Sequence, residues 1–254
     1  MKPLISLKGR RIFVAGGSRG IGRAAALMAA EAGANVAVGY CRDAVAAGDT
    51  VRQIEALGRR AIALKADVVD EAEMAGAVER AAGALGGLDG LVVSAGSYSG
   101  AAIGEMTLPF WNETIAVNLT GTFLAVKAIV PELRRTGKGG SIVIYTSIAG
   151  QNGSSRYSAY AASKGGQIVF MRSMAKELAP DRIRVNCVAP GWTDTDLARA
   201  PMEAIGLEKV AAEIPLGRIG RPADVAGATV YLLSDLAEFV TGVTLAVDGG
   251  KSMR

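Results

Sequence analysis

The sequence predicts an α/β protein in which a doubly wound parallel sheet of about seven strands is covered by helices on both faces. Two observations lead to this fold class. Short apolar runs alternate along the chain with longer helical patterns, as parallel strands and their right-handed crossovers require. The first apolar run also leads directly into a glycine cluster and then an alanine-rich helix. The chain has 254 residues, half of them apolar, which is enough to bury the core of a single domain spanning residues 1–254.

Each expected strand is a short run of β-branched or other apolar residues bounded by turn-forming residues. The expected strands are 11–15, 34–39, 60–66, 88–94, 142–146, 183–188 and 243–247. This pattern is that of a Rossmann-type sheet.

The expected helices fill the intervals between these strands. Gly33 ends the first helix and Gly58 the second, because glycine readily takes the left-handed conformation that closes a helix. The other helices are 44–57, 71–85, 111–135 with Pro131 bending its last turn, one holding Tyr160, and 222–233. Residues 191–216 are too long for a simple connection, and we interpret about 192–216 as a lid over the substrate.

Composition excludes several classes of function. The chain contains no histidine, so Ser-His-Asp hydrolysis and histidine-ligated metal sites are ruled out, and no metal site is predicted. Cys41 and Cys187 lack metal-ligand spacing and are interpreted as free thiols in a reducing compartment. The net charge is +4 and the pI is about 9.1, but the basic residues are scattered, which argues against nucleic-acid binding. No signal-peptide core and no apolar stretch of ~18 residues is evident, so we expect a cytoplasmic protein without a membrane span.

The stretch from Tyr157 to Lys164 holds the main catalytic candidates. Tyr160 and Lys164 are four residues apart and would share one helix face. A nearby ammonium favours a phenolate, so Lys164 is expected to lower the pKa of Tyr160 towards neutrality. Ser147, at the end of the preceding strand, could hydrogen-bond a carbonyl oxygen as charge develops on it. The alternative is a chance meeting of a tyrosine and a lysine on a helix surface.

A glycine turn lies between the first strand and the first helix. Gly16, Gly20 and Gly22 bring bare backbone and a helix N-terminus together, which suits a pyrophosphate group. A glycine cluster alone indicates only a tight turn; its position in a βαβ unit favours a dinucleotide site.

The Ser147, Tyr160 and Lys164 spacing and the glycine turn resemble those of the short-chain dehydrogenase/reductase (SDR) family, over about residues 7–251. Within that family the chain looks most like 3-oxoacyl-[acyl-carrier-protein] reductases. The resemblance implies a Rossmann fold, a nicotinamide cofactor, and a catalytic set of Asn118, Ser147, Tyr160 and Lys164. It further implies that Asn118 bends its helix and holds a water leading to Lys164.

The resemblance also implies a set of cofactor contacts. Ala15 stands where the family usually has Thr, Ser94 replaces the last Asn of its Asn-Asn-Ala-Gly segment, and Thr193 replaces an Ile. Asp67 has the alternative of a solvated carboxylate, and Thr195 that of a helix N-cap. The implied cofactor-binding residues are Gly16, Ser18, Arg19, Gly20, Ile21, Gly22, Tyr40, Arg42, Asp67, Val68, Ser94, Ala95, Gly96, Tyr160, Lys164, Pro190, Gly191, Thr193 and Thr195.

The residue at the end of the second strand favours NADP(H) over NAD(H). NAD-preferring Rossmann proteins place a carboxylate there for the ribose 2′-hydroxyl, whereas this chain has Tyr40. Arg19 and Arg42 match basic positions in NADP-preferring relatives. Asp43 could be presented instead if the loop shifts.

The expected reaction is reversible hydride transfer between a ketone and a secondary alcohol. The substrate could be an acyl thioester, as in 3-oxoacyl-[acyl-carrier-protein] reductases, or a sugar, steroid or alicyclic ketone. Lys138 and Arg182 could lie near an acidic carrier protein or could be scattered surface charges. A catalytically silent NADP-binding regulator is the alternative from another class.

A homotetramer is also expected. Residues 162, 166, 169 and 173 form a stripe of mostly small side chains on the face of the helix opposite Tyr160. Related proteins use that face between subunits. The alternative is packing against a helix of the same chain.

Overall fold

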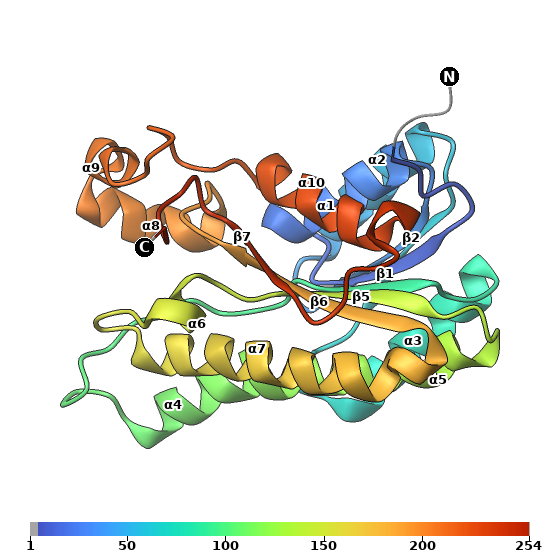
Figure 1. Ribbon diagram of the computed structural model, residues 1–254, viewed down its shortest axis with the longest axis horizontal. Coiled ribbons are helices and arrows are strands. Elements are labelled where there is room, and N and C mark those ends of the chain that lie inside the picture. Colours follow the sequence, from blue (N-terminus) through green and yellow to red (C-terminus); the bar gives the residue numbers. More distant parts are fainter. Residues whose placement is uncertain (1–4, 254) are drawn as a thin grey trace.

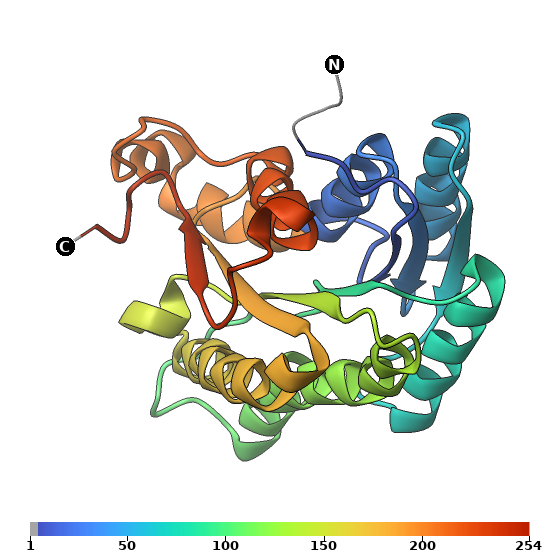
Figure 2. The same cartoon turned by 45° about the vertical axis from the view of Figure 1, so that its right-hand side comes forward.

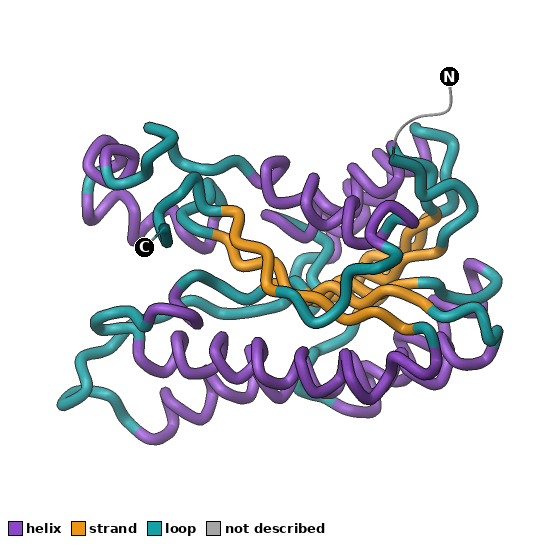
Figure 3. The backbone as a smooth tube through the Cα atoms, viewed as in Figure 1, coloured by secondary structure: helices purple, strands orange, loops and turns teal. Residues whose placement is uncertain are grey.

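The computed structural model describes residues 5–253 and consists of a parallel sheet between two layers of helices (Figures 1 and 3). The seven strands lie in the order β3-β2-β1-β4-β5-β6-β7, all parallel, which confirms the predicted fold class. The strands are β1 Arg11–Ala15, β2 Asn35–Tyr40, β3 Ala61–Lys65, β4 Gly90–Val93, β5 Gly140–Tyr145, β6 Ile183–Pro190 and β7 Thr244–Val247.

The two helix layers bury separate apolar clusters, one on each face of the sheet (Figures 1 and 2). One layer contains α1 Gly20–Glu31, α2 Ala44–Ala56 and α10 Pro222–Leu233. The other contains α3 Glu71–Leu85, α4 Leu108–Ile115, η1 Ala116–Thr120, α5 Gly121–Arg135 and α7 Ser158–Leu178. Shorter elements are α6 Ala149–Asn152, η2 Ala179–Asp181, α8 Asp196–Ile205, α9 Leu207–Ala212 and η3 Asp235–Ala237.

Local capping residues set several helix boundaries. The side chain of Asp43 accepts a hydrogen bond from the Ala46 amide (2.9 Å) where α2 begins, and Asp70 does the same at the start of α3. Gly86 ends α3 in the left-handed conformation, with φ of 81°.

The predicted helix 111–135 is a continuous helical segment, Leu108–Arg135, with a π-helical turn in its middle. It begins three residues earlier than expected because the Thr107 hydroxyl accepts a hydrogen bond from the Phe110 amide (3.3 Å). Its length and hydropathy are those of a possible membrane span, contrary to the expectation that no stretch would qualify. Its apolar residues contribute to the core beneath the sheet, and a buried core helix meets the same criterion.

The direction of strand order reverses between β1 and β4, so a crevice opens at their carboxyl ends. The Ala15 carbonyl accepts hydrogen bonds from the Ser94 amide (2.8 Å) and the Ala95 amide (2.9 Å). The two chain segments are therefore joined by backbone although Ala15 has no hydroxyl. The Ser94 hydroxyl lies against Gly22, where an added Cβ would be 2.7 Å from it.

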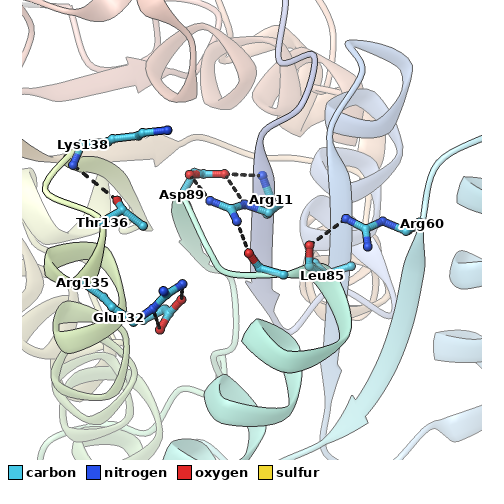
Figure 4. A network of polar contacts seen from close by, with 9 residues as sticks. Arg11, Arg60, Leu85, Asp89, Glu132, Arg135, Thr136 and Lys138 are labelled. Atoms are coloured by element: carbon cyan, nitrogen blue, oxygen red, sulfur yellow. Dashed lines mark hydrogen bonds and ion pairs between the residues drawn. The ribbon is translucent and has the colours of Figure 1, made fainter.

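A polar network lies at the opposite end of the sheet, where the strands begin (Figure 4). Arg11 donates to both carboxylate oxygens of Asp89 at 2.8 Å, and its backbone amide also donates to Asp89. Lys138 precedes β5 and Arg182 precedes β6 at this edge. The six residues of β5 separate them from the crevice by roughly 20 Å, which favours the alternative that they are scattered surface charges.

Candidate active site

The catalytic candidates meet at the carboxyl ends of β4, β5 and β6. Ser147 follows β5, while Tyr160 and Lys164 lie one turn apart near the start of α7. Ser147 and Tyr160 line a cavity of about 440 Å³. Lys164 is buried behind them.

Lys164 carries its ammonium in the protein interior, only 5% exposed. Its Nζ donates a hydrogen bond to the Tyr145 carbonyl at 2.8 Å and lies 5.7 Å from the centre of the Tyr160 ring. Burial lowers the pKa of Lys164 to about 8, because the interior disfavours the charged form.

The pKa of Tyr160 is raised, not lowered as the sequence led us to expect. Burial of the phenol raises its pKa to about 12, and a hydrogen bond with Ser147 opposes only part of this effect. The Tyr160 phenol therefore keeps its proton at neutral pH in the protein alone.

Asn118 lies fully buried in the π-helical turn η1. Its Oδ1 accepts a hydrogen bond from the Ser97 amide (2.8 Å), and its Nδ2 donates to the Ser97 carbonyl and to Ser163 Oγ (both 3.1 Å). Asn118 thus joins three parts of the site: η1, the loop after β4, and α7. The irregular helix matches the bend that the family resemblance implied.

The sequence did not single out the groups that hold Asn118. The Asn118 carbonyl accepts hydrogen bonds from Thr122 Oγ1 (2.7 Å) and from Gln167 Nε2 (2.8 Å). Gln167 follows Lys164 by three residues, so its spacing on α7 was the only signal available. Its Oε1 is buried without a hydrogen-bond partner. Whether Asn118 supports a proton relay stays a prediction.

The glycine turn has the shape that a dinucleotide pyrophosphate requires. A Cβ on Gly22 would collide with the Gly16 carbonyl oxygen, and one on Gly16 would lie 2.6 Å from the Ala95 amide. Arg19 is the N-cap residue of α1 but makes no side-chain capping hydrogen bond, and the first turn has no acidic residue. The first amides of α1 therefore remain available to an anionic group, and the residues fit the predicted cofactor.

The basic residues predicted to select NADP(H) are exposed beside this turn. Arg19 and Arg42 make no ion pair within residues 5–253, and Tyr40 ends β2 partly buried. The carboxylate of Asp43 is engaged in capping α2. In this structure Asp43 therefore serves as a helix cap.

The other predicted cofactor residues lie on loops along the same edge of the sheet. Asp67, after β3, accepts a hydrogen bond from the Val69 amide (3.2 Å), and Val68 packs against Gly121. Thr195 is the N-cap residue of α8, but its hydroxyl donates to the Thr193 carbonyl (3.4 Å) and does not cap the helix. Those that also line the cavity are Ile21, Tyr160, Pro190, Gly191, Thr193 and Thr195.

The remaining cavity wall comes from residues between 148 and 154, after β5, and from aromatic, lid and C-terminal residues. Tyr98 and Trp192 form part of it, with Leu197 and Ile205 from α8. Lys251 also reaches the cavity, although nothing in the sequence connected it with the site. Residues 192–216, predicted as a lid, form α8 and α9 (Figure 1), and residues of α8 line the cavity.

Comparison with known proteins assigns the chain to a family. Residues 15–252 match a family model described as enoyl-(acyl carrier protein) reductase. A solved short-chain type dehydrogenase/reductase from Mycobacterium marinum superposes with a TM-score of 0.92 at 35% identity, covering 98% of both chains. The chain belongs to the short-chain dehydrogenase/reductase family. It is therefore a dehydrogenase/reductase acting on an alcohol or ketone.

Two curated relatives of this SDR protein carry different substrate names. An L-rhamnose 1-dehydrogenase (NAD(P)(+)) from Sphingomonas sp. is 40% identical over 245 residues, covering 96% of both chains. A 3-oxoacyl-[acyl-carrier-protein] reductase from Synechocystis sp. is 38% identical over 251 residues, covering 98% of this chain and all of the relative. Similarity alone therefore leaves the substrate class open.

Replacing Lys164 with Met is expected to stabilise the protein at pH 7. The pKa of Lys164 is lowered from 10.5 to about 8, so folding at neutral pH forces a charge into the interior. At ~1.4 kcal/mol per pH unit this costs roughly 3–4 kcal/mol. As pH rises above 8 the folded protein loses this proton before the unfolded chain does, so the penalty fades.

Urea unfolding at pH 7 and at pH 9.5 measures this effect as the difference between Lys164→Met and wild type. The stabilisation should be largest at pH 7 and smaller at pH 9.5. A variant less stable than wild type at pH 7, or a difference independent of pH, would contradict the account.

Proposed function

We propose that this SDR protein is an NADP(H)-dependent oxidoreductase that interconverts a ketone and a secondary alcohol. The observation that carries the proposal is the placement of Tyr160 and Ser147 on the cavity with Lys164 buried behind them. The glycine turn and the free amides of α1 support a dinucleotide beside it. A regulator that binds the cofactor without catalysis is less well supported, because it would not need Ser147, Tyr160 and Lys164 at the cavity.

Three side chains carry the proton chemistry. The nicotinamide, when bound, supplies or accepts the hydride. Tyr160 keeps its proton at neutral pH and can donate it to the oxygen of a ketone as negative charge develops there. Ser147 hydrogen-bonds the same oxygen and orients the carbonyl. Lys164 places a positive charge behind Tyr160 and stabilises the phenolate left after donation.

Tyr160→Phe is expected to lower kcat by about 10²–10⁴-fold, because only the phenolic proton is removed. Steady-state reduction kinetics measure the rate, and NADPH fluorescence titration should give a Kd within a few-fold of wild type. Tyr231→Phe, on the other face of the sheet in α10, is the matched control. A Tyr160→Phe enzyme within a few-fold of wild type would remove the phenol from the mechanism.

The preference for NADP(H) rests on charge at the end of β2. Arg42 follows this strand end and Arg19 lies in the glycine turn, both exposed, and the carboxylate of the neighbouring Asp43 faces the amides of α2. A ribose 2′-phosphate would thus meet two cations. The curated relative named L-rhamnose 1-dehydrogenase (NAD(P)(+)) is described with both cofactors, which is compatible with a preference set by a few residues.

Arg19→Ala combined with Arg42→Ala should shift the ratio of kcat/KM for NADPH to that for NADH towards NADH. Each charged hydrogen bond is worth ~1.5–3 kcal/mol, or roughly 10- to 100-fold. Arg52→Ala, on the exposed side of α2, is the control. Wild-type preference for NADH, or an unchanged ratio in the double variant, would refute the assignment.

The substrate proposed from the family resemblance is a 3-oxoacyl thioester, and the Synechocystis relative supports it. The second candidate is a ring compound such as a sugar or alicyclic ketone. Two observations favour the ring. Lys138 and Arg182, the basic residues considered for carrier docking, lie at the far edge of the sheet. The cavity wall is also partly aromatic, with Tyr98 and Trp192 beside Tyr160.

We also propose a homotetramer, because two separate apolar surfaces are exposed. On α5 and α7, Phe123 is 44% and Val169 62% exposed, although Gly166 of the predicted stripe packs against Leu119 of the same chain. Near the edge strand β7, Phe239 is fully exposed. Two different two-fold contacts would generate a tetramer. We propose a cytoplasmic location for this assembly.

Val169→Glu is expected to reduce the mass of the assembly, because it places a charge in the contact on α7. Multi-angle light scattering at micromolar concentration measures the mass, and Gln53→Glu on α2 is the control. A monomeric wild type would refute the assembly.

A further inference from the structure

The aromatic wall beside Tyr160 is held by contacts between rings. Tyr98 stacks on Tyr157, with ring centres 4.5 Å apart and planes 5° from parallel. It meets the Tyr160 ring edge-on at 4.8 Å and the Trp192 ring edge-on at 6.1 Å. These contacts join the loop after β4, the start of α7 and the segment after β6. Tyr98 and Trp192 both line the cavity, so a substrate carbonyl held at Tyr160 lies next to fixed aromatic surface.

An ion pair stands on the wall of the same cavity. Glu213 follows α9, and Lys251 comes from the C-terminal turn; the Lys251 ammonium donates to Glu213 Oε2 at 2.5 Å. The turn is held by Asp248, whose carboxylate accepts hydrogen bonds from the amides of Gly250 (2.9 Å) and Ser252 (2.8 Å). These hydrogen bonds to the backbone of the turn fix the position of Lys251 in the ion pair.

The ion pair retains hydrogen-bonding capacity for a ligand. An ammonium has three donors and a carboxylate about four acceptor positions, and their mutual contact uses one of each. Because the two charges neutralise one another, the pair suits neutral groups that both donate and accept, which is the property of hydroxyls. Hydrogen bonds to charged groups are also stronger than those between neutral groups.

The lid side of the cavity is apolar. Leu197 and Ile205 of α8 line the same cavity as the aromatic wall and the ion pair. The cavity of about 440 Å³ also includes residues of the cofactor side, such as Ile21 and Thr195, so only part of it is left for substrate. It therefore suits a compact molecule with an apolar face and a polar edge.

From these features we infer that the substrate is a neutral, polyhydroxylated six-membered ring, such as a pyranose or a cyclitol. The inference rests on the proposed function and names the substrate class of the same site. The C–H face of such a ring packs on Tyr98 and Trp192, one carbinol faces Tyr160 and Ser147, and other ring hydroxyls reach Glu213 and Lys251. Glu213, Lys251 and Trp192 are then specificity-determining residues.

Other substrate classes use these groups less well. A ring that bears a carboxylate would have to compete with Glu213 for Lys251 and leave one charge unpaired. A simple alicyclic alcohol has nothing to bond to the ion pair and would leave its remaining hydrogen-bonding groups unmet. A 3-oxoacyl thioester would bring an extended chain, which has no ring to stack on the wall of Tyr98 and Trp192.

The test compares kcat/KM across four kinds of substrate with NADP⁺ or NADPH. They are aldopyranoses epimeric at each ring carbon with myo-inositol, cyclohexanol, cis-4-hydroxycyclohexanecarboxylate, and acetoacetyl-N-acetylcysteamine in the reductive direction. We expect the best polyhydroxylated ring to exceed each of the other three by at least about 10-fold. Another class equalling or exceeding it overturns the inference while the proposed function stands. Failure of every secondary alcohol and ketone to turn over refutes the proposed function itself.

Three variants test the residues, with cofactor affinity and thermal unfolding as checks on folding. Glu213→Gln and Lys251→Met should each lower kcat/KM for the best polyhydroxylated ring by roughly 10- to 100-fold, and for cyclohexanol by less than about 3-fold. Trp192→Leu should lower kcat/KM for both rings, because it removes the shared stacking surface. Glu208→Gln, an exposed acid on α9, is the matched control and should alter neither.

Equal losses on both substrates in Glu213→Gln and Lys251→Met would show that the ion pair only holds the lid, and this overturns the inference. The same conclusion follows if neither variant changes the polyhydroxylated ring's kcat/KM. If an ion-pair variant unfolds, Trp192→Leu still tests the inference. A Trp192→Leu protein with the wild-type kcat/KM for the polyhydroxylated ring would show that the aromatic wall does not recognise the substrate, and this overturns the inference.

Discussion

The buried ammonium of Lys164 is the constraint on which the site depends. A charge in the interior is tolerated only when it is hydrogen-bonded, and here the Tyr145 carbonyl at the end of β5 receives it. The Tyr145 hydroxyl is hydrogen-bonded to Thr229 of α10 at 2.7 Å, on the other side of the sheet. The residue that receives the ammonium is thus fixed from both helix layers. The positions of Tyr160 and of the first turns of α7 follow from this attachment.

The order of strands and helices could be predicted from sequence because most strands are short and buried, and because local residues cap the helices between them. Asp70 before α3 and Gly86 after it are typical: both act within a few residues, so local pattern records them. The π-helical turn at Asn118 could not be predicted in the same way. One extra residue in a long apolar helix barely changes its periodicity, and what stabilises the turn is Gln167, 49 residues away.

The residues of the site also differ in whether the sequence could predict them. Ser147, Tyr160 and Lys164 are visible in sequence because their spacing on one helix and one strand end is local. Glu213 and Lys251 are visible only in the structure, since the lid and the C-terminal turn meet after folding. The predicted direction of the pKa shift of Tyr160 was wrong for a related reason. Burial is a property of the whole fold, and here its effect on the pKa outweighs that of the nearby charge.

The C-terminal turn has a consequence for how the protein is handled. Leu216 donates its amide to the Gly249 carbonyl at 3.1 Å, and a Cβ on Gly249 would press against Ile214, so the turn packs tightly on the end of the lid. Met253, the last described residue, follows Lys251 by two positions, and Lys251 lines the cavity. We therefore expect an affinity tag at that end to hinder substrate binding, and assays made with it to understate affinity. Purification sequences are therefore better joined at the amino end, because β1 lies away from the C-terminal turn (Figure 1).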